Sequence, residues 1–212
     1  MSNINKRRGK LVVVAGSSGA GKTTLVQAMI PHLAAKYGLT TQRVVTYTTK
    51  PPRPGELPGR DYHYLSPADF QAKVAEQFFL EWSQAYGYYY GTPAGVLERL
   101  TAGISLFLIV DLAGVQALRR LNLVDAIYIW ITAPPADLAQ RLAQRRTEAA
   151  VEIAKRLVLA QQEVVLISQQ APQLFDFILA NDRELKSAIA DLEQLIVHRL
   201  GLCPLPEANL SN

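Results

Sequence analysis

One eight-residue segment near the N-terminus has the residue types and the spacing of a phosphate-binding loop. The segment "GSSGAGKT", residues 16–23, fits the pattern G-x-x-x-x-G-K-[ST] completely and stands between a strand-like run and a helix-like run. Glycines allow successive backbone N–H groups to face one concave surface, to which the positive end of the next helix adds. Lys22 can reach the β- and γ-phosphates, and Thr23 can offer its hydroxyl to Mg²⁺. We therefore predict a nucleoside triphosphate site made of Gly16, Ser17, Ser18, Gly19, Ala20, Gly21, Lys22, Thr23 and Thr24.

Such a loop does not define the reaction, because switch GTPases, motor ATPases and small-molecule kinases all have one. A switch GTPase normally carries an N-K-x-D segment for base recognition, which this sequence lacks. A motor ATPase normally has an apolar strand ending in a paired Asp-Glu, whereas "LFLIVDL" supplies only Asp111. A kinase needs a second pocket for the acceptor and a cover that excludes water. The irregular segments 48–93 and 145–156 are candidates for those two parts.

The composition is typical of one globular unit. The chain has 212 residues, of which 49% are apolar, and a net charge of only +4. Such mild basicity suits an anionic ligand but does not indicate a dedicated nucleic-acid binder. The single cysteine, Cys203, can form no intrachain disulfide, which favours a reducing compartment. With no apolar run near the ~18 residues of a membrane span and no signal-peptide pattern, we expect a cytoplasmic protein without membrane or nucleic-acid partners.

Apolar runs rich in β-branched residues alternate with helical patterns along the chain. The runs lie at 10–16, 43–48, 104–112, 126–132 and 176–182. Runs of this kind suit strands that are buried on both faces of a parallel sheet. The alternation therefore predicts an α/β fold with helices on both faces of the sheet. Pro31 is expected to kink or divide the first helix.

Two segments that follow the phosphate loop resemble the guanylate kinase family. They are "TYTTKPPRPGELPGRDYHYLSPADF" and "FLEWSQAYGYYYGT", and the resemblance extends from about residue 10 to about residue 200. It implies a P-loop NTPase-type parallel sheet with helices on both faces, an inserted nucleoside-monophosphate-binding subdomain and a short lid. The implied division of the chain is a domain at 1–200, with core 10–47 and 93–200, insertion 48–92 and lid about 143–156, followed by a flexible tail at 201–212.

The resemblance also implies that the insertion binds GMP. Lys50 and Arg53 match two family arginines on the GMP phosphate, and Tyr62 and Tyr90 match two tyrosines whose hydroxyls bind it. Glu81 matches a carboxylate that accepts from guanine N1–H and the 2-amino group. Taken alone, Tyr90 is also compatible with packing at a strand edge and Glu81 with a solvated carboxylate. The other implied GMP-binding residues are Thr46, Thr92 and Asp111.

Residues in the C-terminal half of the chain match the family's lid and ATP site. Arg141, Arg145 and Arg156 match arginines around the lid, whose planar groups suit a transferring phosphoryl group, and Arg146 stands where the family usually has glycine. Asn181 matches an asparagine near the adenine of ATP, with capping of the following helix as the alternative.

The implied activity is transfer of phosphate from ATP to GMP with Mg²⁺, with these two nucleotides as partners. Two departures leave alternatives open. Lys50 keeps the charge of an arginine but not its bidentate fork. Ile109 stands where the family commonly has an acid, and isoleucine accepts no hydrogen bond. The alternatives are a P-loop kinase with a different phosphorylated acceptor, and a catalytically weak GMP-binding or interaction module.

Overall fold

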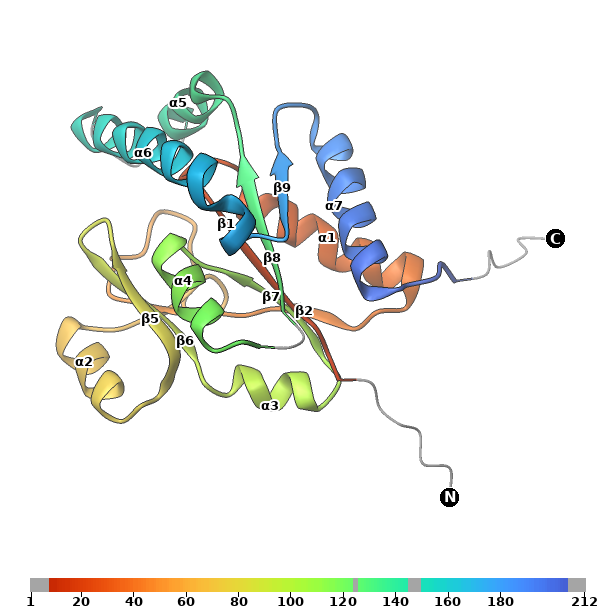
Figure 1. Cartoon of the computed structure of the whole chain (residues 1–212). Coiled ribbons are helices and arrows are strands. Elements are labelled where there is room, and N and C mark those ends of the chain that lie inside the picture. The colour runs from red at the N-terminus through yellow and green to blue at the C-terminus, as the bar shows by residue number, and fades with distance from the viewer. Residues whose placement is uncertain (1–7, 124–125, 145–149, 206–212) are drawn as a thin grey trace.

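A five-stranded parallel sheet forms the centre of the molecule (Figure 1). The computed structural model describes residues 8–123, 126–144 and 150–205. The strand order is β2-β7-β1-β8-β9, and every neighbouring pair is parallel. The strands are β1 Leu11–Gly16, β2 Thr41–Arg43, β7 Ser105–Ile109, β8 Ala126–Thr132 and β9 Phe177–Ala180. The α/β prediction is confirmed.

Helices cover both faces of this central sheet because alternate strand residues are apolar on both sides. Val12 and Val14 of β1 belong to one core, and Leu11 and Val13 belong to the other. The first core contains residues of α1 Lys22–Tyr37, α5 Pro135–Gln144 and α7 Leu185–Leu200, and the second contains residues of α3 Val96–Thr101 and α4 Leu112–Arg120. The long helix α6 Ala150–Leu174 contributes to both, through Ala160 and Ile167. Among the described helices, none combines the length and the apolar character that a membrane span requires.

Helix α1 is continuous from Lys22 to Tyr37, so Pro31 does not divide it, and the other expectation, a kink at Pro31, stays a prediction. Proline removes one N–H from the helix, and the hydrogen bonds on either side suffice to continue it. The apolar face of α1, which includes Leu25, Met29 and Leu33, is fully buried. This packing offsets the loss of one backbone bond.

A four-stranded small sheet, in the order β4-β3-β6-β5, lies beside the central sheet (Figure 1). Its elements are β3 Tyr47–Thr48, β4 His63–Tyr64, β5 Phe79–Ala85, β6 Tyr88–Pro93 and the neighbouring helix α2 Pro67–Ala75. Phe70 of α2 stacks on Phe79 and Tyr89, with ring centroids 4.6 and 5.4 Å apart. These ring contacts fix the outer face of the β5–β6 hairpin, and so fix which residues its inner face presents.

The prediction of one strand over residues 43–48 is wrong, because this segment serves both sheets. Strand β2 ends at Arg43, and the N–H of Val44 still donates to Phe107 of the central sheet at 2.8 Å. Strand β3 begins at Tyr47, and the carbonyl of Thr46 already accepts from His63 of the small sheet at 2.9 Å. Apolar character alone does not reveal which strand each half pairs with.

Candidate active site

A cavity lies at the carboxyl edge of the central sheet, where ligands bind in open α/β folds. The phosphate loop, the small sheet, the end of β7 and α6 all line it. The predicted site residues that line it are Gly16, Ser18, Gly19, Gly21, Lys22, Thr23, Thr24, Thr46, Lys50, Arg53, Tyr62, Glu81, Tyr90, Asp111 and Arg156. Five others support this lining from behind or beside it: Ser17, Ala20, Thr92, Arg141 and Asn181.

The phosphate loop has the backbone that its glycines permit. Gly19 and Gly21 have φ angles of +91° and +88°, in the left-handed region that other residues rarely adopt. The Nζ of Lys22 donates to the carbonyls of Gly16 at 2.6 Å and Ser17 at 3.0 Å. The ammonium group therefore lies over the loop, where an incoming phosphate would meet it.

Asn181 shapes this loop from behind. Its Nδ2 donates to the carbonyl of Ala20 at 2.8 Å, and a β-carbon at Gly21 would lie only 2.5 Å from the same Nδ2. The alternative that Asn181 caps the last helix is wrong, because α7 begins at Leu185 and its N-cap is Glu184. The carbonyl of Asn181 accepts from Arg141 Nη2 at 3.0 Å.

Arg156 connects the phosphate loop with the small sheet. Its Nη1 donates to Ser18 Oγ at 3.0 Å, and its guanidinium carbon lies 5.1 Å from the centre of the Tyr86 ring at the tip of the β5–β6 hairpin. The guanidinium group therefore lies between the phosphate loop and the tip of this hairpin. Arg145 and Arg146 lie outside the described residues.

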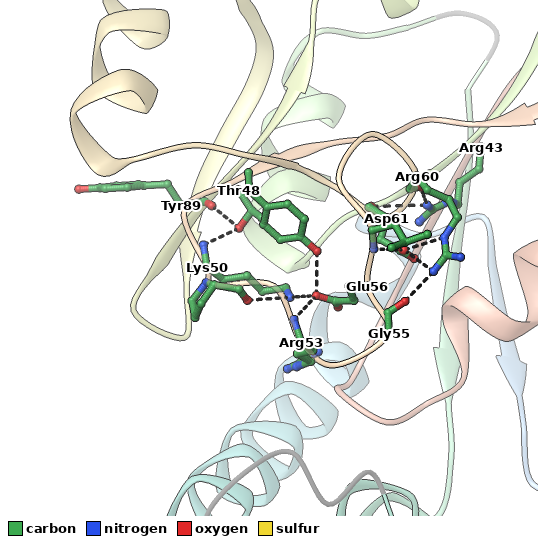
Figure 2. Close-up of polar contacts among 12 residues, drawn as sticks. Arg43, Thr48, Lys50, Arg53, Gly55, Glu56, Arg60, Asp61 and Tyr89 are labelled. Carbon is green, nitrogen blue, oxygen red and sulfur yellow. Dashed lines mark hydrogen bonds and ion pairs between the residues drawn. The ribbon is translucent and has the colours of Figure 1, made fainter.

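Glu56 organises the part of the proline-rich loop that carries Lys50 and Arg53; we define this loop as residues 48–64 (Figure 2). Its Oε2 accepts from the backbone N–H of Arg53 at 2.8 Å and from the Tyr64 hydroxyl at 2.8 Å, and it forms an ion pair with Lys50. These bonds hold the pKa of Glu56 below its usual value, although burial acts against them. One carboxylate oxygen thus holds Lys50 and Arg53 close together.

Lys50 is buried, with 6% of its surface exposed, and its Nζ lies 5.0 Å from the centre of the Tyr62 ring. Burial lowers the pKa of Lys50, and burial raises the pKa values of Tyr62 and Tyr90. Both phenols therefore stay neutral near pH 7 and can donate hydrogen bonds to an anion. This end of the cavity has the chemistry of a phosphate site.

A second set of hydrogen bonds orders residues 55–61 of the same loop (Figure 2). Arg60 Nη2 donates to the carbonyl of Gly55 at 2.7 Å, and Asp61 accepts from the N–H of Leu57 at 2.9 Å. Arg43 donates to the carbonyl of Arg60 from the edge of the central sheet. The loop is thus ordered by its own side chains and by Arg43, which lowers the entropy cost of binding a ligand there.

Two carboxylates face the cavity at its other end. Glu81, 7% exposed, accepts from Thr92 Oγ1 at 2.5 Å, and burial raises the pKa of Glu81 to about 7. Asp111 accepts from Ser83 Oγ at 2.7 Å and from the N–H of Gly114 at 2.8 Å. These groups suit a ligand that presents hydrogen-bond donors.

Four polar residues that line or organise this cavity had no role assigned to them from the sequence: Glu56, Ser83, Tyr86 and Glu163. Glu163 of α6 has an oxygen, Oε2, that is buried without a hydrogen-bond partner among the described residues, and burial raises its pKa. Ser83 lies two residues after Glu81, and the period of a strand could have placed it on the same face. Nothing local in the sequence indicates that Glu163 faces the phosphate loop.

Comparisons with known proteins identify the family of the chain. The family description "Guanylate kinase" matches residues 8–199 of the chain. The chain belongs to the guanylate kinase family. The guanylate kinase of Rubrobacter xylanophilus is 41% identical over 83% of this chain and 87% of its own length. That of Symbiobacterium thermophilum is 36% identical over 91% of this chain and 87% of its own.

A solved structure of the same family shares the fold. The crystal structure of guanylate kinase from Anaplasma phagocytophilum has a TM-score of 0.68 to this chain and covers 91% of it, while 87% of that structure is matched. Only 18% of the residues are identical, so this likeness concerns the fold alone. The guanylate kinase resemblance and the predicted fold class are both confirmed.

Proposed function

We propose that this chain transfers the γ-phosphate of ATP to GMP, giving ADP and GDP. The observation that carries the proposal is one cavity with a phosphate loop on one wall and, on the other, a cationic loop and two carboxylates. Lys22 and Arg156 would neutralise charge on the transferring phosphoryl group. Lys50, Arg53, Tyr62 and Tyr90 would hold the GMP phosphate for in-line attack. Membership of the guanylate kinase family supports this activity.

Base selection is assigned to the carboxylates. Guanine has donors at N1–H and at the 2-amino group, and a carboxylate accepts two parallel hydrogen bonds. We assign Glu81 to N1–H and one amino hydrogen, with Thr92 fixing its orientation, and Asp111 to the other amino hydrogen. Adenine has no matching pair of donors, so AMP is expected to be a poor acceptor.

We assign a magnesium-binding role to Thr23. Mg²⁺ prefers oxygen ligands and is usually held by one or two protein groups together with substrate phosphates. Thr23 lines the cavity beside Lys22, and the carboxylates of Asp111 and Glu163 line it too. No cluster of three metal-binding side chains occurs among the described residues, so most ligands would be phosphate oxygens and water. The bound ion would neutralise phosphate charge.

The domain boundaries stay predictions, as does the cytoplasmic location, which rests on the cysteine count of the sequence. The activity is tested by coupled measurement of ADP release with GMP, dGMP, AMP, UMP and CMP at equal concentration. We expect turnover with GMP to exceed that with every non-guanine acceptor. Faster turnover with another acceptor would favour the kinase of different specificity, and binding of GMP without turnover would favour the weak module.

A further inference from the structure

A hydrogen bond between two side chains joins the small sheet to the end of a central strand across the cavity. Ser83 lies on β5 of the small sheet, and Asp111 follows β7 of the central sheet. Ser83 Oγ donates to Asp111 Oδ2 at 2.7 Å, and both residues line the cavity. Ser83 is 7% exposed, so water competes little for this bond.

Among the described residues, one other hydrogen bond restrains the carboxylate of Asp111. As the N-cap of α4, it accepts from the N–H of Gly114 through Oδ1 at 2.8 Å. That bond fixes one oxygen, and the bond from Ser83 fixes the other. Each carboxylate oxygen has about two acceptor positions, so one on each stays available to a ligand.

Space and charge around Asp111 make its orientation important. A β-carbon at Gly114 would lie 3.0 Å from Glu81 Oε2, so the helix that carries Asp111 approaches Glu81 closely. The nearby charge of Asp111 adds to the burial that raises the pKa of Glu81. A small rotation of the Asp111 carboxylate would move its charge little relative to Glu81, but it would change the direction in which the carboxylate accepts a hydrogen bond from the ligand.

We infer that Ser83 is a positioning residue for acceptor selection: its hydroxyl holds the Asp111 carboxylate so that it accepts the second hydrogen of the guanine 2-amino group. The inference rests on the proposed function. Ser83 acts through Asp111, and the group it selects for is the exocyclic amine. IMP has the same ring and phosphate but no 2-amino group, so its kinetics report every contact of the acceptor except those made to that amine.

The test compares GMP and IMP as acceptors for the wild type and for Ser83→Ala. We expect kcat/KM for GMP to fall about tenfold, mainly through KM, as is typical for loss of a hydrogen bond to a charged group. We expect kcat/KM for IMP and the KM for ATP to stay within about twofold of the wild-type values. A twofold change corresponds to less free energy than one ordinary hydrogen bond contributes. Ser83→Thr keeps the hydroxyl and should restore the ratio of GMP to IMP. Calorimetric titration with GMP should show the same loss of affinity without turnover.

Two control variants show whether a change in kcat/KM for GMP is due to the bond between Ser83 and Asp111. Ser105→Ala removes another buried serine hydroxyl, one that accepts from the backbone N–H of Lys10 at 3.1 Å outside the cavity, and should alter stability only. In an Asp111→Asn background, Ser83→Ala should have a smaller effect on GMP than in the wild type, because coupled residues are not additive. If Ser83→Ala does not fold, Ser83→Cys replaces it.

The inference is overturned if Ser83→Ala, or the cysteine variant, weakens GMP and IMP equally or leaves GMP unchanged. Failure of the proposed function is a separate result, since it appears as a lack of GMP turnover by the wild type before any variant is compared.

Discussion

Glu81 and Thr92 face each other on neighbouring strands of the small sheet, and the Thr92 hydroxyl donates to Glu81 Oε1 at 2.5 Å. Both residues are buried. This bond favours the ionised carboxylate, but burial outweighs it and raises the pKa of Glu81 from its ordinary 4.5 to about 7. A residue assigned to guanine therefore titrates in the range where enzymes are usually assayed.

We expect kcat/KM for GMP to rise with pH between about 6 and about 8, because only the ionised carboxylate accepts from both guanine donors. GMP itself loses a phosphate proton near pH ~6. The pH profile of the wild type is therefore compared with that of Glu81→Gln. This variant should have a much higher KM for GMP, and its profile should show only the titration of GMP itself. An unchanged KM for GMP in this variant would remove Glu81 from the site.

The same shift has a consequence for stability, with the opposite dependence on pH. The unfolded chain releases the Glu81 proton near pH 4.5, whereas the folded chain holds it until about 7. Relative to Glu81→Gln, the unliganded wild type should lose thermal stability as the pH rises through this window. Melting curves at several pH values measure the difference, and a constant difference would contradict the raised pKa.

Lys22→Ala should lower kcat by at least about 100-fold, as loss of a group that stabilises transition-state charge typically does. The side chain lies over the phosphate loop rather than in either core, so we expect the fold to survive. Circular dichroism and a thermal melt provide the control. Turnover near that of the wild type in a folded variant would contradict the assignment of the loop.

Lys50→Arg should lower the KM for GMP several-fold, because a guanidinium group makes two parallel hydrogen bonds to phosphate and an ammonium group does not. The KM for ATP should stay unchanged. The matched variant Glu56→Gln removes the ion pair but keeps an oxygen for Arg53 and Tyr64. Since Lys50 is buried, a melting curve distinguishes strain caused by the larger side chain from a direct effect on binding.

Ile109→Asp should lower the KM for GMP if the missing acid weakens acceptor binding. Ile109 lines the cavity and packs against the first core, so the variant should also melt at a lower temperature. Ile109→Asn, of similar size and without charge, separates the two effects. A folded Asp variant that gains nothing with GMP, beside a parent that phosphorylates another acceptor faster, would mean that the pocket serves a different substrate.

Local patterns made the phosphate loop and the central sheet predictable. The conformation of the eight residues from Gly16 to Thr23 follows from their own types, because this loop needs glycines with positive φ at fixed positions between a strand and a helix. The apolar runs likewise predict buried strands from their residue types. The resemblance to a family added the residues of the small sheet, which composition and period alone could not assign to a ligand.

Contacts between distant segments were not predictable in the same way. Asn181 precedes a helix and looks like a cap, yet its side chain reaches Ala20 across the fold. Glu163 and Ser83 meet the cavity only after α6 and the small sheet have packed. The split of residues 43–48 between two sheets also depends on partners far away in the chain.

Two segments of the described chain connect the two sheets, residues 44–46 and residues 94–104, and the second of these contains α3. Such a pair of crossings can act as a hinge about which the small sheet turns as a rigid body. A turn would carry Lys50 and Glu81 toward or away from the phosphate loop, while the bonds of Glu56 inside the proline-rich loop stayed intact. The bond from Ser83 to Asp111 spans the gap that such a turn would open. The Ser83 hydroxyl, which orients Asp111, would then also hold the small sheet to the central sheet in the closed arrangement.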